Sequence, residues 1–207
     1  AGTLARHFQL VPVCPEVAVG LGVPREPLRL VGRPEAPRAM SFNSMSFNGM
    51  HVHDPARDVT ADLARYGRRM ARELEGISGY LFKSGSPSCG VERVKVHGGR
   101  GGMPAKAGTG IYAREIIAAL PLLPVEEEGR LNDPILRDHF IERVCAYHRW
   151  QALLREGLTP ARLAAFHARH ELVLIAHGAG AESPLGRRLG RLAAGAQADK
   201  IQSIPLA

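Results

Sequence analysis

Two cysteines, each set among proline and glycine residues, are the side chains of this sequence best suited to chemistry. Cys14 and Glu16 lie in the stretch VPVCPEVAVG, and Cys89 follows Ser86 and Ser88 in the loop sequence KSGSPSCG. Backbone N–H groups exposed in such loops can lower the pKa of a thiol or hydrogen-bond a metal-bound sulfur. The two stretches can therefore form a thiolate or metal site, or they can be tight turns in which cysteine serves as a small residue.

The other candidates for chemistry have weaker patterns. Cys145 lies in the apolar stripe of a predicted helix, where free cysteine packs as a small hydrophobic residue. His167 and His170 are three residues apart on another predicted helix, but no carboxylate or cysteine joins them at a metal-binding spacing. We therefore expect exposed or capping histidines. The acidic run at 126–128 could assist catalysis or bind a cation, and we favour solvated carboxylates or contacts with arginines.

The pattern of apolar residues predicts strands that alternate with helices in the first part of the chain. Strands are predicted at 8–13, 28–31, 79–82, 91–96 and 122–128, and helices at 58–75 and 111–120. This alternation predicts an α/β fold with a Rossmann-like parallel sheet layer. Ligands bind outside the carboxyl ends of parallel strands, which would bring Cys14 and Cys89 to one edge. The repeated MSFN within residues 40–50 is expected to be a low-complexity insertion in a surface loop.

The pattern becomes helical near residue 133. Helices are predicted at 133–157, 159–178 and 183–195, the first two with a proline near the start and a glycine at the end. We therefore divide the chain into an α/β domain at 1–129 and a small all-α domain at 130–207. The first carries 16 Lys and Arg against 13 Asp and Glu, and the second 11 against 7, so the helical domain is the more basic per residue. The net charge of +7 favours a polyanionic partner.

Composition and cysteine count indicate where such a protein works. The 207 residues are 45% hydrophobic and 23% charged, as in a globular protein, and they contain no apolar run of the length that spans a membrane. Three cysteines cannot form a closed set of disulfides, and the sequence shows no export signal. We therefore expect reduced thiols in a cytoplasmic protein that has no membrane partner.

Three stretches of the α/β part resemble a known enzyme family, in the same order and the same structural context. They are VPVCPEVAVGLGVPREPLRL, KSGSPSCGVERVKV and LLPVEEEGRLNDP, and they resemble the 2-thiouracil desulfidase (TudS-like) family. Residues 140–177 resemble the start of the helical domain found in the two-domain version of that family. The combination is similar to bacterial (RudS-like) desulfidases that remove sulfur from 4-thiouridine in tRNA. The resemblance covers roughly residues 6–178.

The resemblance implies an iron–sulfur desulfidase that converts thiolated uracil to uracil and releases sulfide. Its cofactor is a 4Fe–4S cluster held by three cysteines, whose open iron takes the thiocarbonyl sulfur before water replaces it, so that the C–S bond is hydrolysed overall. By this resemblance, Cys14 and Cys89 are two of the cluster ligands. Glu16 transfers a proton or activates water, Ser86 orients the base or the departing sulfur, and Ser88 is a further catalytic candidate. The expected partner is a thiolated nucleobase, or a tRNA bound by the helical domain.

One ligand of the family is missing from this sequence. The third cysteine of the family lies in a cysteine-leucine-leucine-glycine motif on a strand upstream of the PVCPE segment, which would precede residue 1. We therefore expect a chain truncated at its N-terminus, with an incomplete helical domain and a poor hold on a cluster. Two other functions stay open: an RNA-binding remnant without catalysis, and a dithiol redox or zinc-binding protein that uses Cys14 and Cys89.

Overall fold

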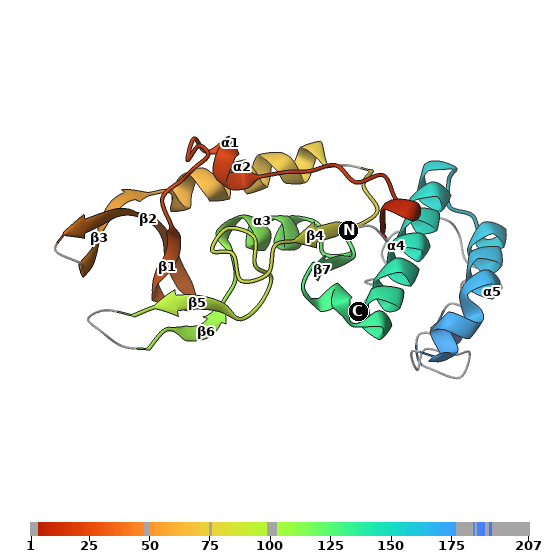
Figure 1. Ribbon diagram of the computed structural model, residues 1–207. Coiled ribbons are helices and arrows are strands. Elements are labelled where there is room, and N and C mark those ends of the chain that lie inside the picture. The colour runs from red at the N-terminus through yellow and green to blue at the C-terminus, as the bar shows by residue number, and fades with distance from the viewer. Residues whose placement is uncertain are drawn as a thin grey trace. The chain divides into compact units, whose positions relative to one another are not determined.

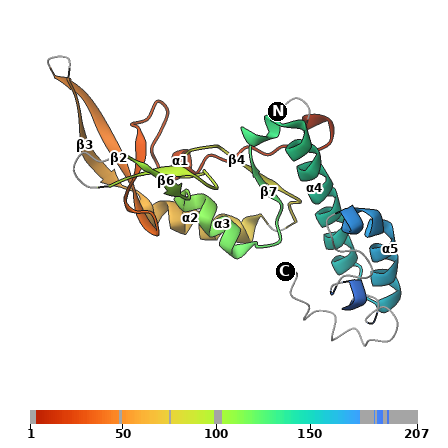
Figure 2. The ribbon, with the colours of Figure 1, turned by 90° about the horizontal axis from the view of Figure 1, so that it is seen from below.

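A computed structural model of the chain forms two compact units (Figures 1 and 2). The structure describes residues 4–47, 50–74, 76–98, 103–176, 184, 186–188 and 191. Within these ranges, only the backbone is described at 43–47 and 50–56. The first unit comprises residues 1–75, 81–121 and 125–133. The second comprises residues 76–80, 122–124 and 134–207.

The first unit is built on a mixed sheet that has five strands in the described part of the chain. In spatial order the strands are β3 (Met50–Asp58), β2 (Ala36–Phe47), β1 (Leu28–Arg33), β5 (Val94–His97) and β6 (Ala105–Gly108). Strands β1 and β5 are parallel, with Leu30 opposite Val96, and the other neighbours are antiparallel. A two-residue turn joins β1 to β2, and a turn of this length can connect only antiparallel strands. The predicted α/β class is confirmed, with a mixed sheet in place of a purely parallel one.

Two helices pack on this sheet and confirm the helices predicted at 58–75 and 111–120. They are α2 (Thr60–Glu73) and α3 (Ile111–Ala119), which lie side by side in Figure 2. Leu63 of α2 and Ile111 of α3 are fully buried in one core with Leu30 of β1. Gly67 allows the two helices to approach closely, because a Cβ atom there would lie 2.8 Å from the Cβ of Glu115.

The second cysteine stretch directly follows a strand that belongs to a separate pair of short strands. Strands β4 (Tyr80–Phe82) and β7 (Val125–Glu127) pair with each other. They run in the same direction, since the N–H of Tyr80 donates to the Pro124 carbonyl and the N–H of Glu128 donates to the Phe82 carbonyl. Because the strands are parallel, their carboxyl ends meet, and the KSGSPSCG loop begins beside the acidic run.

Two predictions in the first unit are wrong. Residues 8–13 form no strand, because Pro12 interrupts the run and cannot donate to a sheet. Cys14 is instead the N-cap residue of the short helix α1 (Pro15–Ala18), which begins with a proline. Residues 40–47 and 50 belong to the β2–β3 hairpin, where we expected a surface loop. The Asn-Gly dipeptide at 48–49 in the sequence is a strong hairpin signal that the MSFN repeat obscured.

The second unit is helical. It contains α4 (Pro134–Arg155) and α5 (Pro160–Ala176), which lie side by side in Figure 1 and confirm the helices predicted at 133–157 and 159–178. Trp150 contacts Phe166 edge to face, with 5.5 Å between the ring centroids. Two short 3-10 turns, Leu4–Arg6 and Arg130–Asn132, complete the described elements. Most of the helix predicted at 183–195 lies outside the described residues.

In the part of the chain that the structure describes, no helix combines the length and the apolar character needed to cross a lipid bilayer.

Candidate functional site

The cysteine loop (residues 83–92) meets helix α1 through one carboxylate and two serine hydroxyls. Ser88 Oγ donates to Glu16 Oε1 at 2.6 Å, and Ser86 Oγ lies 3.3 Å from the same oxygen. Arg25 Nε holds the other carboxylate oxygen of Glu16 at 2.7 Å, and the Glu16 side chain is only 14% exposed. Residues some 70 positions apart in the sequence therefore form one polar cluster.

The serine hydroxyls form a chain of hydrogen bonds that ends on Glu16. Ser86 Oγ accepts the N–H groups of Ser88 and Cys89 at 3.3 and 3.2 Å, and it lies 2.9 Å from Ser88 Oγ. Ser88 has a single hydroxyl proton, so it can donate one strong hydrogen bond. The shorter contact is with Glu16 Oε1 at 2.6 Å, and Cys89 Sγ lies farther away, at 3.5 Å. Ser88 is fully buried and Ser86 is half-buried, so Ser86 is the hydroxyl that a substrate can reach.

The two thiols of this cluster differ in their surroundings. Cys14 is exposed and Cys89 is partly buried. Burial raises the pKa of the Cys89 thiol to about 11; the charges of Glu16 and Cys14 also raise it, whereas the hydroxyls of Ser88 and Ser86 lower it. Cys14 is thus within electrostatic reach of Cys89. At neutral pH, and without a bound metal, Cys89 is a protonated thiol.

The sequence predicted that Cys14 and Cys89 meet at one edge of a parallel sheet, and this prediction is wrong. Cys14 follows no strand, and β4 belongs to the separate β4–β7 pair, outside the five-stranded sheet. The hydrogen bonds from the cysteine loop to Glu16 connect the two segments instead. Glu16, Ser86, Ser88 and Cys89 nevertheless form one hydrogen-bonded cluster, and Cys14 lies within electrostatic reach of Cys89.

Helix α3 anchors the cysteine loop from one side. The amides at the first turn of a helix have no partners within it, and here the carbonyl of Ser88 accepts the N–H of Ala113 at 3.1 Å. Next to it, the N–H of Gly110 donates to the Gly90 carbonyl at 2.7 Å. Gly110 leaves room for this contact, because a Cβ atom there would lie 2.5 Å from the carbonyl carbon and oxygen of Ser88.

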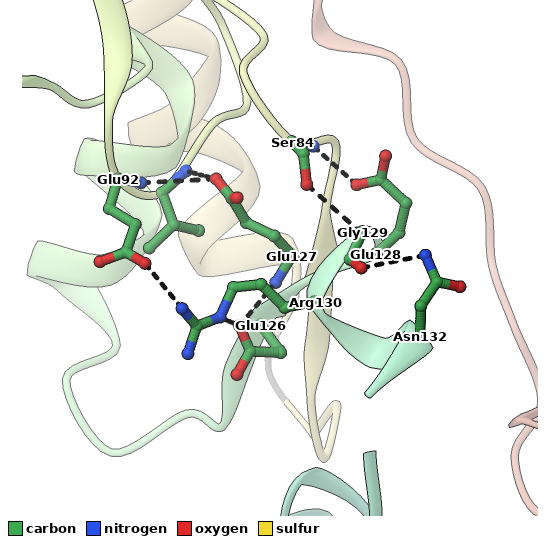
Figure 3. Close-up of polar contacts among 9 residues, drawn as sticks. Ser84, Glu92, Glu126, Glu127, Glu128, Gly129, Arg130 and Asn132 are labelled. Atoms are coloured by element: carbon green, nitrogen blue, oxygen red, sulfur yellow. Dashed lines mark hydrogen bonds and ion pairs between the residues drawn. The ribbon is translucent and has the colours of Figure 1, made fainter. Parts of the chain in front are cut away.

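Glu127 holds the end of the cysteine loop (Figure 3). Its carboxylate is 7% exposed, and its Oε1 accepts the N–H of Val91 at 2.7 Å and, more weakly, that of Glu92 at 3.4 Å. Glu126 forms an ion pair with Arg130 at 2.8 Å. We expected solvated carboxylates or arginine contacts in this acidic run. That expectation is right for Glu126 and wrong for Glu127, whose role is to bind loop backbone.

Glu128 holds the start of the same loop. Its Oε2 accepts the N–H of Ser84 at 2.6 Å, and its Oε1 pairs with Lys83 (Figure 3 shows the Ser84 contact). Burial raises the pKa of Glu128, but the hydrogen bonds from Lys83 and Ser84 outweigh it and hold that pKa below its ordinary value. The cysteine loop is therefore fixed at its start by Glu128, at its end by Glu127 and along its length by α3.

Replacing Glu127 with alanine should lower the free energy of unfolding by about 1–3 kcal/mol, because two backbone N–H groups would lose a buried acceptor. Glutamine at the same position keeps one acceptor oxygen and should lose less than alanine does. Urea unfolding of both variants measures the difference. As a control, Glu73→Ala removes a carboxylate that is 54% exposed and should change stability by about 0.5 kcal/mol or less. Equal losses for Glu127→Ala and Glu73→Ala would contradict the role of Glu127.

The remaining predicted candidates lie in the helical unit. Cys145 is half-buried within α4. We expected exposed or capping histidines, but His170 is only 6% exposed. Its ring centroid lies 4.2 Å from that of Phe166, its Nδ1 lies 2.8 Å from the Phe166 carbonyl oxygen, and its Nε2 lies 3.4 Å from an Arg149 nitrogen. Among the residues that the structure describes, no group of three or more histidine, cysteine or acidic side chains could hold a metal ion.

Comparison with known families identifies the family of the chain. A sequence model described as 2-thiouracil desulfurase matches residues 1–128, which is more than half of the chain. The chain belongs to the 2-thiouracil desulfurase family. The family's name denotes an enzyme that removes sulfur from 2-thiouracil. The match includes α1, the cysteine loop and the acidic run. Searches of curated proteins and of solved structures found no match.

The donor set of this desulfurase fits a three-cysteine cluster only in part. Cys14 is close enough for its charge to raise the pKa of Cys89, after burial as the largest cause, and both are free thiols. The third cysteine, Cys145, belongs to the helical unit, and no histidine or acidic side chain completes a metal-binding group in the described ranges. The described residues therefore supply two of the three thiolates that such a cluster needs.

Sequence reasoning missed two residues of the desulfurase site. Arg25 lies in the proline- and glycine-rich stretch at 19–38, where no periodic pattern marks it, and its contact with Glu16 depends on the path of the chain. Gly110 directly precedes the helix predicted at 111–120, and a glycine at that position was a usable signal for close backbone contact. Both residues support the cluster from outside the stretches that carry the thiols.

Proposed function

We propose that this desulfurase removes sulfur from thiolated uracil by net hydrolysis, with 4-thiouridine in tRNA as its substrate. The reaction replaces C=S with C=O: one water is consumed, its oxygen bonds to carbon, and both of its protons leave with sulfur as hydrogen sulfide. No electrons are exchanged overall. The observation that carries this proposal is the hydrogen-bonded series Ser86, Ser88, Glu16 beside the Cys89 thiol.

The residues of the cluster supply what this hydrolysis needs from the protein. Water must lose a proton as it bonds to carbon, and Glu16 Oε1 is the carboxylate oxygen that would accept it and later return it to the departing sulfur. Arg25 and Ser88 fix the two carboxylate oxygens, so the acceptor is oriented before substrate binds. The half-buried Ser86 hydroxyl would orient the base. Ser88 is fully buried and acts as a positioning residue for Glu16.

The proposal includes a 4Fe–4S cluster as cofactor, with Cys14 and Cys89 as two of its ligands. When bound, such a cluster supplies a Lewis-acidic iron with affinity for sulfur. Ligation needs thiolates, so binding at Cys89 would release the proton that this thiol holds at neutral pH. The free cysteines also support the proposed cytoplasmic location, where thiols stay reduced.

The proposed tRNA substrate is supported by charge and by the second unit. Residues 130–207, which include the helical part, carry 11 Lys and Arg against 7 Asp and Glu. A free base needs only a pocket, whereas a tRNA needs a basic surface for its phosphates. We therefore propose that the helical unit contributes to RNA binding.

Anaerobic reconstitution with iron, sulfide and an excess of a small thiol, which can supply the thiolate that the described residues lack, followed by incubation with thiolated tRNA, tests the function. We expect a protein with visible iron–sulfur absorbance that releases sulfide and forms uridine, and we expect Cys89→Ala to lose both properties. Cys145→Ala is the matched control and should keep them. A colourless protein that still binds tRNA would contradict the proposal and favour an RNA-binding remnant. A preparation that takes up zinc in place of iron would favour a dithiol zinc protein.

A further inference from the structure

The five-stranded sheet has one side that packs on helices α2 and α3 and one side that does not. Leu30 of β1 and Val96 of β5 are buried on the helix side. Successive side chains of a strand point to opposite sides, so Arg29 and Lys95 lie on the second side, and so does Lys106, the partner of Lys95 on β6. Arg29 is half-buried, and the two lysines are exposed. We call this second side, marked by these three cations, the open face.

The three cations of the open face form a row across three neighbouring strands. Lys95 of β5 lies directly opposite Lys106 of β6, and Arg29 occupies the corresponding position of β1. Neighbouring strands are about 4.8 Å apart, so the row is about 10 Å long. Neither lysine forms an ion pair among the residues that the structure describes. Like charges opposite each other destabilise a sheet, so folding alone does not explain this row, and a bound anion would relieve the repulsion.

The surroundings of the row show that its charges act together. The guanidinium carbon of Arg29 lies 5.3 Å from the centre of the Phe42 ring of β2, which holds the cation at the open face. Burial lowers the pKa of His97 on β5, and the charges of Arg29 and Lys95 lower it further. His97 is therefore neutral at pH 7, and the positive charge of the row belongs to the arginine and the two lysines.

The two segments of the thiol cluster lead directly into the strands that carry the row. Arg29 follows Arg25, the ion-pair partner of Glu16, by four positions, and Lys95 follows Cys89 by six. A chain spans at most about 3.6 Å per residue, so the Cα atoms of these two pairs are no more than about 14 and 22 Å apart. A strand of RNA on the open face can therefore extend to the thiol cluster over a few nucleotides.

We propose that the open face binds the sugar–phosphate backbone of RNA next to the thiolated nucleotide, which gives the first unit an RNA-binding surface of its own. A row of cations without carboxylate partners suits a polyanion, because each contact with a phosphate releases a condensed counterion. Lysine is depleted at protein–protein interfaces and is typical of basic surfaces that bind nucleic acid, which favours RNA over an acidic protein. The inference rests on the proposed function and adds a second contact to that of the helical unit.

Binding of an unmodified uridine oligonucleotide to the full chain, measured by fluorescence anisotropy at several salt concentrations, tests the open face. We expect Lys95→Gln/Lys106→Gln to weaken binding about tenfold at low salt and to reduce the slope of log K against log salt by about 1.4, or about 0.7 for each lost contact. Urea unfolding should show a double variant at least as stable as the wild type, because the change removes a like-charge pair. This result would separate RNA binding from folding.

Arg68→Gln is the control for the double variant. Arg68 lies on α2, on the helix side of the sheet, where it pairs with Glu115 of α3. Its replacement should leave the affinity for the oligonucleotide and the salt slope unchanged. Unchanged affinity and slope in the lysine variant would overturn the proposal. Poly-glutamate that displaces the oligonucleotide as well as RNA does, at equal charge, would also overturn it and would favour an acidic protein partner.

Desulfuration of a thiolated RNA by the reconstituted protein distinguishes the open face from the proposed function. Sulfide release with an unchanged KM in Lys95→Gln/Lys106→Gln would support the desulfurase function and overturn the role of the open face. A protein that releases no sulfide, but whose binding of unmodified RNA still depends on the two lysines, would support the open face and contradict the desulfurase function.

Discussion

Replacing Glu16 with glutamine is expected to lower the rate of sulfide release by about 10²–10⁴-fold, the range typical of a lost general acid–base group. Glutamine has the same shape and still offers an oxygen to the Ser88 hydroxyl, which now lies 2.6 Å from Glu16 Oε1. It cannot take a proton from water. The loss should therefore fall on kcat, with the affinity for 4-thiouridine changed much less.

Arg25→Gln is the control for this variant. It removes the 2.7 Å ion pair to Glu16 but leaves the carboxylate and its contact with Ser88 in place. If Glu16 acts through proton transfer, Arg25→Gln should lose far less activity than Glu16→Gln. Single-turnover measurements of sulfide release compare the two. A Glu16→Gln protein that keeps more than about a tenth of the wild-type rate would rule out proton transfer by this residue.

Gly110→Ala is expected to destabilise the protein by about 3 kcal/mol or more, the upper range for overpacking a tight contact. The added Cβ would lie 2.5 Å from the carbonyl carbon and oxygen of Ser88 and 2.7 Å from the amide nitrogen of Cys89. All three are backbone atoms, so no side-chain rotation relieves the clash. Either the cysteine loop moves away from α3, or the helix shifts.

Urea unfolding and a desulfuration assay together measure the effect of Gly110→Ala. We expect a lower free energy of unfolding and a large loss of activity, because the displaced backbone carries Ser88 and Cys89. Gly98→Ala serves as the control: a Cβ at Gly98 would meet nothing within 4 Å, and its stability should stay within about 0.5 kcal/mol of wild type. Matching stabilities for the two alanine variants would show that the loop does not depend on this close contact.

Both predictions depend on a cysteine loop that is held before any substrate arrives. Glu128 binds the amide of Ser84 near its start, Glu127 binds the amides of Val91 and Glu92 at its end, and the first turn of α3 binds carbonyls between them. A site whose groups are already oriented loses less entropy when it binds its substrate. Glu127 and Glu128 therefore support the site by binding the backbone of the cysteine loop.

Local pattern was a good guide wherever an element is determined by its own residues. The helices at 60–73, 111–119, 134–155 and 160–176 follow from apolar spacing of three and four, reinforced in α4 and α5 by prolines at their starts. The same reasoning failed at 8–13, where an apolar composition suggested a strand although Pro12 interrupts it. It failed again in the β2–β3 hairpin, where a repeated tetrapeptide resembled low complexity.

The residue types alone predicted the candidate site residues and the family, because a family motif is a short run of residue types that can be recognised without coordinates. How those residues meet follows only from the folded chain. Glu16 joins α1 to a loop some 70 residues away, and Glu127 reaches 36 residues back to Val91. Such contacts depend on the path of the whole chain, and the spacing of neighbouring residues does not encode that path.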